Sequence, residues 1–236
     1  MKAYKILLSG LVIAGLMFTT SCINGISGNG DVEVRIESID DFDRLEIDGN
    51  FKVFLTQSDR PGLKIEADEN LLEYIEVRQV GNKLEIESKR NIFRAKKKDL
   101  HIKYTDLQRI ELSGALDVNG ETPIEVKSLL IDCSGAIDLN IDVIAERLRL
   151  DVSGAADCDL NGRVKDVSLN ISGAGDFNAF GLRAEDVNID MSGAASARVF
   201  ATDMLDVEIS GAGSVKYKGD PDIRRNISGI GSLRKY

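Results

Sequence analysis

Residues 147–160 read R-L-R-L-D-V-S-G-A-A-D-C-D-L, and this stretch decides the fold. Apolar residues occupy every second position on both sides of its Ser-Gly pair. Successive side chains of an extended strand point to opposite faces, so alternation with period two indicates β-strands. The stretch therefore predicts two short strands joined by a turn at Ser153 and Gly154.

The Ser-Gly pair recurs at regular intervals through the second half of the chain. Its serines, spaced by 18 to 21 residues, are Ser113, Ser134, Ser153, Ser172, Ser192, Ser210 and Ser228. Such a period is typical of a solenoid in which each repeat forms one rung. A unit containing a strand and a crossover helix would need about 30 residues. The repeat thus predicts an all-β fold, a single-stranded right-handed parallel β-helix with about 19 residues per coil.

Stacked repeats would place equivalent residues in columns. One predicted inward column holds Leu112, Cys133, Val152, Ile171, Met191, Ile209 and Ile227. A second holds Val118, Leu139, Cys158, Phe177, Ala197, Val215 and Leu233. Both columns are apolar in every repeat, which supports this register. The Gly of each pair is expected at a corner with a restricted backbone.

The first half of the chain has looser alternation, and we interpret 31–106 as less regular coils that precede the regular coils of 107–236. A Gly81-Asn82 pair between two apolar runs predicts a hairpin turn. Residues 69–74 are expected to hold one helical turn. No linker rich in Pro, Gly or Ser follows position 40, so 31–236 is predicted to be a single β-helix domain.

The first 21 residues have the order of an export signal: two lysines, a short apolar run and then small residues. Cys22 follows at once, which resembles the lipobox of bacterial lipoproteins. Residues 1–21 are therefore predicted to be a lipoprotein signal peptide, with Cys22 lipidated and 22–30 a flexible tether. The alternative is an ordinary secreted protein in which Cys22 is an incidental thiol.

Charge and cysteine content limit the partners. The formal net charge is −9, and it becomes −11 without residues 1–21, which contain Lys2 and Lys5 and no acid. Such an acidic chain argues against nucleic acid as a partner, and also against holding anionic lipid by charge. Cys133 and Cys158 fall in different inward columns and are expected to be buried free thiols. His101 is the single histidine, and no metal or other cofactor is predicted.

An outward column of carboxylates lies between the two apolar columns. Its acidic members are Asp117, Asp138, Asp157 and Asp176. One hypothesis is that Ca²⁺ bridges this ladder, because Ca²⁺ takes six to eight oxygen ligands. The favoured interpretation is a solvated acidic face, since the Gly-rich nonapeptide of calcium-binding β-rolls is absent. A second acidic column begins at Glu111 and includes Asp132 and Asp151.

Two basic clusters stand out. Residues 89–98 contain six Lys or Arg and no acid, and we interpret them as a solvated loop, with a docking patch for an anionic glycan or partner as the alternative. Near the C-terminus, Arg224, Arg225, Arg234 and Lys235 make the last coil basic. Charges there would help to cap the open end of the solenoid, because unpaired strand edges recruit other chains.

The repeats also resemble a known family. Three features carry the resemblance: residues 42–57 (F-D-R-L-E-I-D-G-N-F-K-V-F-L-T-Q), the Ser-Gly-Ala repeats, and the closing G-D-P of 219–221 with I-S-G-I-G-S of 227–232. Over roughly 40–236 the chain resembles the auto-transporter adhesin, head GIN domain family. The resemblance implies a single β-helical domain, often an exported lipoprotein of Gram-negative bacteria. It implies no catalytic or ligand residues.

These observations favour a non-catalytic cell-envelope lipoprotein of the outer membrane, with the periplasmic or surface side left open. Its stacked faces would have a binding, adhesin-like or scaffold role toward a glycan or another protein. One alternative is a carbohydrate-active β-helix enzyme, a polysaccharide lyase or hydrolase. Coils of 18 to 21 residues leave little chain for the walls of a cleft, which argues against it. The other alternative is a structural envelope protein that forms oligomers.

Overall fold

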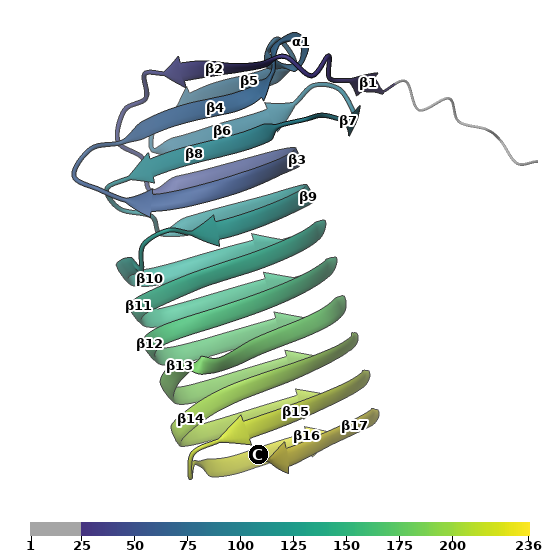
Figure 1. The fold of residues 1–236 in the computed structure, drawn as a ribbon. Helices are drawn as coiled ribbons and strands as arrows, with labels where there is room; N and C mark the ends of the chain where they lie inside the picture. Colours follow the sequence, from purple (N-terminus) through teal and green to yellow (C-terminus); the bar gives the residue numbers. More distant parts are fainter. Residues whose placement is uncertain (1–24) are drawn as a thin grey trace, which may run out of the picture.

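A computed structural model describes residues 25–236 of the chain. The predicted signal peptide 1–21 and the predicted lipidation site Cys22 lie outside the described residues. About 75% of the structure is strand, in stacked parallel coils of about 19 residues that make about seven turns. The predicted parallel β-helix is confirmed. Figure 1 shows α1, β1 and β2 at one end of the stack and the C-terminus at the other.

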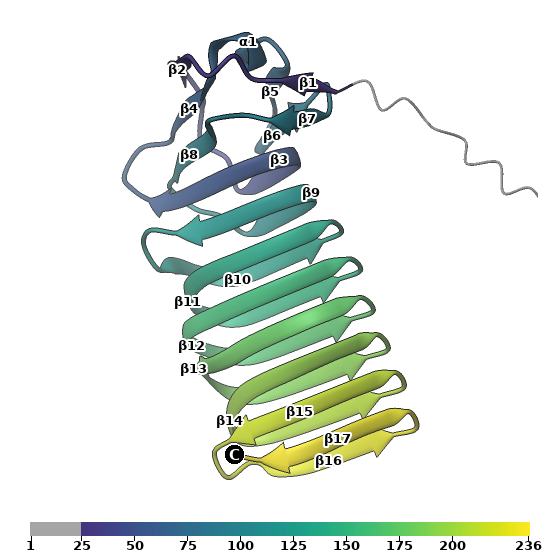
Figure 2. The same cartoon turned by 45° about the vertical axis from the view of Figure 1, so that its right-hand side comes forward.

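The regular part of the solenoid begins at β9 and runs to the last residues. Its strands are β9 (Arg109–Gly120), β10 (Ile124–Cys133), β11 (Ala136–Val152), β12 (Ala155–Ile171), β13 (Ala174–Met191), β14 (Ala194–Ile209), β15 (Ala212–Lys218), β16 (Asp222–Ile227) and β17 (Ile230–Lys235). The longest strands bend near their middle, so each runs along one face of the flattened coil and returns along the other (Figure 2). Six of the Ser-Gly pairs form sharp turns between successive strands, and the first pair, Ser113-Gly114, lies within β9.

The strand register confirms both predicted inward columns. Leu112, Cys133 and Val152 are successive partners in the stack, and so are Val118, Leu139 and Cys158. The columns continue through Ile171, Met191, Ile209 and Ile227, and through Phe177, Ala197, Val215 and Leu233. Side chains of both columns are buried until the last coil, where Ile227 and Leu233 are half-buried. This apolar axis is the continuous core of the protein.

The glycines of the turns are required by contact between coils. A Cβ on Gly173 would lie 1.7 Å from the carbonyl oxygen of Gly154, and a Cβ on Gly154 would lie 2.1 Å from that of Gly135. Neither Gly154 nor Gly173 has a positive φ. The expected restricted backbone conformation is therefore not the reason for glycine at these two positions. Backbones at the turn stack so closely that no side chain fits between them.

The N-terminal region is built differently. Its elements are β1 (Ile26–Ser27), β2 (Val32–Glu37), β3 (Arg44–Gln57), β4 (Gly62–Asp68), α1 (Glu69–Leu72), β5 (Ile75–Val80), β6 (Lys83–Ser88), β7 (Ile92–Arg94) and β8 (Lys98–Tyr104). Strand β3 stacks in parallel on β9, as a coil should. However, β4 pairs antiparallel with both β8 and β2, and β5 pairs antiparallel with β6. We call residues 25–106 the N-terminal cap.

The expectation of looser coils in 31–106 holds only in part: β6 and β8 also pair in parallel with β3, but β2, β4 and β5 do not stack as coils. Tight turns reverse the chain within the cap, and reversed neighbours pair antiparallel rather than stack. The hairpin turn predicted at Gly81-Asn82 is confirmed between β5 and β6, with Gly81 at φ +58°. The expected helical turn is confirmed as α1.

Candidate functional site

The predicted acidic column is a real feature of one face of the solenoid. Asp138 pairs with both Asp117 and Asp157 in register, and the backbone N–H of Asp176 donates to Asp157 Oδ1 at 3.0 Å. The column continues as Ser196, Ser214 and Ser232. We call the outward surface of β9, β11, β12, β13, β14, β15 and β17 the ladder face.

Neighbouring donors partly offset the carboxylates of the ladder. Lys52 Nζ lies 3.2 Å from Asp117 Oδ2, and Asn119 donates to the other oxygen at 2.7 Å. The Ser196 hydroxyl donates to Asp176. Both members of the Lys52–Asp117 pair are about half exposed, so this contact contributes little to stability. The ladder therefore remains a solvated surface able to accept hydrogen bonds from a partner.

A shallow hollow runs beside the ladder along the solenoid axis. It encloses about 660 Å³ and adjoins the loop 95–99 at one end. Small residues make its floor: Ala115, Ala136, Ala155, Ala174 and Gly175. A second hollow of about 580 Å³ starts at the same Gly175 and reaches Ile230. Together they form an open trough across the coils, with small side chains on its floor and the Asp-to-Ser ladder along its side.

The charge of the ladder face changes sign along the axis. The outward column next to the ladder holds Asn119, Asn140, Asp159, Asn178, Arg198, Lys216 and Arg234 in successive coils. The last coils also carry aromatic side chains, with Lys218 Nζ 4.2 Å from the ring centroid of Phe180 and 5.1 Å from that of Tyr236. The face is thus acidic in its middle coils and basic and aromatic toward the C-terminus.

The second acidic column lies across the Ser-Gly turn from the first. Glu111, Asp132 and Asp151 are register partners there. Arginines neutralise them: Arg109 lies 2.5 Å from Glu111 and 2.8 Å from Asp132, and Arg149 lies 2.8 Å from Asp151. Burial raises the pKa of Asp132, with Arg109 opposing the shift. These three carboxylates are compensated within the protein, whereas Asp138, Asp157 and Asp176 of the ladder form no ion pair among the described residues, so the ladder face is the better candidate for binding.

The serines of the turns have a structural role. Ser134 Oγ donates to the carbonyl of Leu112 at 3.3 Å, and Ser172 Oγ donates to that of Val152 at 3.1 Å. A serine nucleophile needs a nearby general base. His101, the only histidine in the sequence, stacks on Phe54 with ring centroids 4.7 Å apart. One imidazole held in the cap cannot serve a serine in every coil.

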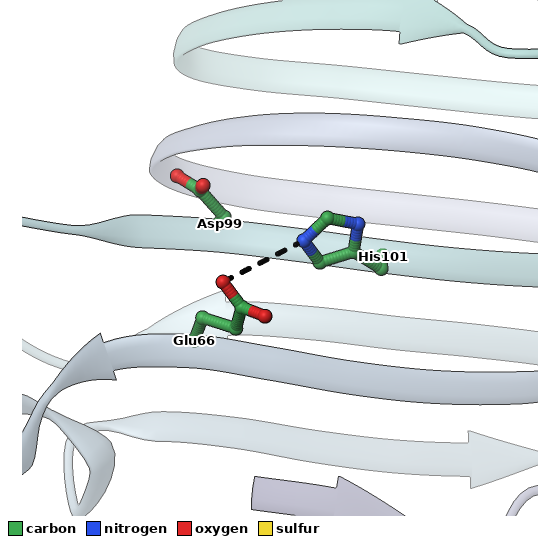
Figure 3. A group of neighbouring side chains, drawn as sticks. All are labelled: Glu66, Asp99 and His101. Carbon is green, nitrogen blue, oxygen red and sulfur yellow. Dashed lines mark ion pairs between the residues drawn. The ribbon is translucent and has the colours of Figure 1, made fainter. Parts of the chain in front are cut away.

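A cluster that sequence reasoning missed lies in the cap. Glu66 on β4 and Asp99 and His101 on β8 bring their potential ligand atoms within 4.8 Å of one another, and within residues 25–236 they are the one such group of three (Figure 3). None of the Asp117–Asp176 ladder belongs to it. Residues 66 and 99 meet through antiparallel pairing, and no local sequence spacing could have shown this.

The lysines around Glu66 occupy its oxygens. Lys64 Nζ lies 2.6 Å from Glu66 Oε1, and Lys97 forms an ion pair with Glu66 and lies 3.5 Å from Asp99. The hydrogen bonds from Lys64 and Lys97 lower the pKa of Glu66 to about 2. His101 Nε2 is 3.9 Å from Glu66 Oε2. A cation entering here would have to displace two ammonium groups, so we assign the cluster as an ion-pair network that stabilises the cap.

The two described cysteines are both free and buried, as predicted. Burial raises the pKa of Cys133 to about 12 and also raises that of Cys158. Thiolates are the reactive form of cysteine. These side chains therefore act as apolar members of the core.

Comparison with known proteins agrees with this architecture. Residues 41–221 match the family described as "Putative auto-transporter adhesin, head GIN domain". The chain belongs to this family. Comparison with curated proteins gives no match.

Solved structures share the fold. A putative adhesin from Bacteroides fragilis is 25% identical, with a TM-score of 0.86 over 90% of this chain and 100% of that chain. A putative lipid binding protein from Parabacteroides distasonis is 24% identical, with a TM-score of 0.73 over 89% and 99%. A putative adhesin from Parabacteroides merdae is 21% identical, with a TM-score of 0.62 over 90% and 99%. The family and the first of these structures fit an exported cell-envelope protein with an adhesin-like role. Within residues 25–236, no helix is long and apolar enough to span a membrane.

Proposed function

We propose that this family member is a non-catalytic binding protein of the cell envelope that presents its ladder face to an extended partner. The observation that carries the proposal is the trough beside the Asp117–Asp176 ladder, which offers the same groups in successive coils. Coils stack about 4.8 Å apart. A glycan chain or an extended protein segment lying along the axis would meet a hydrogen-bond acceptor or a small apolar floor at each step.

The shape of the ladder face favours binding over catalysis. Polysaccharide-cleaving sites need carboxylates held around the scissile bond in a site that limits water. Here the coils are uniform, and the hollows have floors of short side chains. A depolymerisation assay on bacterial polysaccharides tests the enzyme alternative, and cleavage would contradict the proposal.

The N-terminal sequence supports a proposal for the location. We propose that Cys22 is lipidated after removal of residues 1–21 and that the lipid anchors the protein in the outer membrane. Mass spectrometry of the mature N-terminus tests the modification. Protease treatment of whole cells distinguishes a surface location from a periplasmic one.

Binding is tested with a glycan array and with envelope-protein capture, using the full chain and a matched pair of variants. The test variant replaces Asp117, Asp138, Asp157 and Asp176 by Asn. The control variant carries Glu146→Gln, Glu185→Gln and Asp203→Asn, which lie around a different hollow at the bend of the coils. Loss of hydrogen bonds to the ladder should weaken retention of the ligand about tenfold or more, and the control should bind as the wild type does. Equal weakening by both variants would contradict a role for the ladder face.

A further inference from the structure

The segment that precedes the solenoid is paired with the basic loop. Strand β1 (Ile26–Ser27) and strand β7 (Ile92–Arg94) form a separate two-stranded parallel sheet. The N–H of Ile26 donates to the carbonyl of Asn91 at 2.8 Å, and the N–H of Gly28 donates to that of Arg94 at 2.7 Å. Gly25 lies against Phe93, since a Cβ on Gly25 would be 2.2 Å from the ring. The start of the described chain is therefore fastened to residues 91–94, and within the predicted tether 22–30 the described residues 26–30 are held by hydrogen bonds rather than flexible.

A buried carboxylate holds both segments. Asp68 is 1% exposed and accepts hydrogen bonds from the backbone N–H groups of Gly30 at 2.9 Å and Lys97 at 3.0 Å. The N–H of Lys96 donates to it as well, at 3.1 Å. Burial alone would raise the pKa of Asp68, but these N–H groups lower it and keep the carboxylate charged. The loop and the incoming chain are thus fixed relative to each other.

The loop exposes an aromatic ring among cations. Phe93 is 57% exposed, and Arg90, Arg94 and Lys96, its neighbours in the sequence, are exposed as well. Lys89 and Lys97 are neutralised by carboxylates of the cap, but among the described residues Arg90 and Arg94 form no ion pair. The loop is a local basic surface on a protein whose net charge is −9.

The length of chain before β1 limits how far this surface can be from the predicted anchor. Cys22 precedes Ile26 by four residues, and four extended residues span at most about 14 Å. A lipid on Cys22 would bring Phe93 to the membrane surface. Anionic headgroups attract Lys and Arg, and aromatic rings favour the interface.

We propose that Arg90, Phe93, Arg94 and Lys96 dock on an anionic lipid surface beside the anchor. This inference rests on the proposed lipidation of Cys22. The lipid fixes one point of the protein to the bilayer, and a second contact beside it would orient the protein relative to the membrane. Because β1 and β7 lie at the cap end of the stack (Figure 1), docking there directs the coils and the ladder face away from the membrane.

The test uses the intact lipoprotein in vesicles. The sequence contains no Trp, so Phe93→Trp introduces a single fluorescent reporter, and Tyr236→Trp is its control at the other end of the stack, where the ring is also exposed (76%). Vesicles contain brominated phosphatidylcholine with or without phosphatidylglycerol. We expect bromine to quench Phe93→Trp strongly in the anionic vesicles, and to leave Tyr236→Trp almost unquenched. Adding Arg90→Ala, Arg94→Ala and Lys96→Ala to the Phe93→Trp chain should reduce the quenching about twofold or more without changing flotation.

Flotation and quenching separate the two proposals. If the protein floats with the vesicles but bromine quenches the two reporters equally, the proposed docking is wrong and the proposed anchor is retained. Failure to float would overturn the anchor and the docking that depends on it. Circular dichroism of each variant checks that the solenoid is intact, because Phe93 is largely exposed and its replacement should not disturb the core.

Discussion

The N-terminal cap and the regular coils both bury apolar side chains between β-strands, but their strands pair in different ways. In the coils from β9 to β15 each strand has parallel neighbours on both sides, and the core is a repeating apolar axis. In the cap the chain reverses, and Arg78 on β5 forms ion pairs with Glu85 and Glu87 on β6 across a hairpin. The interior of the stack can therefore be built by repeating one sequence pattern, whereas the ends need residues that depart from that pattern.

The C-terminal end is a second exception of another kind. Strands β16 and β17 pair with β14 and β15 on one side, and the described residues include no strand beyond them. Arg225 and Lys235 take the register positions that Val207 and Tyr217 hold one coil earlier. Charged side chains in these inward columns prevent a further coil from stacking there, as expected from the basic residues of the last coil. One end is therefore covered by reversed strands and the other is terminated by charge.

The largest expected effect comes from opening a cavity in the coils. Phe177 is fully buried in β13, and Phe177→Ala should lower the free energy of unfolding by about 4 kcal/mol. Phe93→Ala, the matched change in the cap, removes an exposed ring and should cost less than about 0.5 kcal/mol. Urea unfolding followed by circular dichroism measures both. Equal costs would show that the apolar axis is not the main source of stability.

The next effect tests the close stacking of the turns. Gly173→Ala places a methyl group 1.7 Å from the carbonyl oxygen of Gly154, and we expect a loss of about 3 kcal/mol. Gly62→Ala in the cap is the control, because the nearest atom to its new Cβ is 4.0 Å away and its φ is not positive. Thermal unfolding of the two variants should separate clearly. A stable Gly173→Ala protein would mean that the coils can move apart at the turn.

A smaller effect is confined to the cap. Asp68→Asn removes a charge that three backbone N–H groups stabilise and should cost about 2 kcal/mol locally. Trypsin should then cut within 89–98 faster than in the wild type, while the coils stay resistant. Asp59→Asn, at an exposed loop position, is the control. Unchanged cleavage after Asp68→Asn would show that the loop is held by other contacts.

Acid should weaken the cap before the coils. The folded pKa of Glu66 is about 2 against an ordinary value of 4.5, so its stabilising contribution is present above pH 4.5 and is lost as pH falls toward 2. Hydrogen-exchange protection of β4 and β8 should therefore drop between these values while that of β12 is retained. Glu66→Gln should abolish the difference, and its persistence in this variant would point to another group.

The smallest effect concerns the ladder. Replacing its four aspartates by Asn relieves repulsion between neighbouring carboxylates and should raise the unfolding free energy by about 1 kcal/mol at most. Excess Ca²⁺ is expected to shift the melting temperature of the wild type by no more than about a degree relative to chelator. A larger stabilisation that the Asn variant lacks would favour the calcium hypothesis for Asp117 to Asp176.

Repetition explains why so much of the coils could be predicted. Each Ser-Gly pair marks the same point of a coil, so Leu112 and Cys133 could be aligned without coordinates, and burial of Cys133 and Cys158 followed. The cap offered no such reference. Its hairpin and helical turn depend on neighbouring residues and were predictable, but Glu66 meets His101 only because β4 and β8 pair in opposite directions.

Periodicity alone determined the solenoid, its register and the acidic ladder, because translation along one axis relates every coil to the next. Tertiary structure decided the contacts where that translation stops. These are the antiparallel pairing of the cap strands, the ion pairs around Glu66, and the hydrogen bonds that hold residues 26–30 beside the basic loop. Those contacts join segments tens of residues apart with no repeat between them. Only pairing in three dimensions could select them from the many pairings that the composition allows.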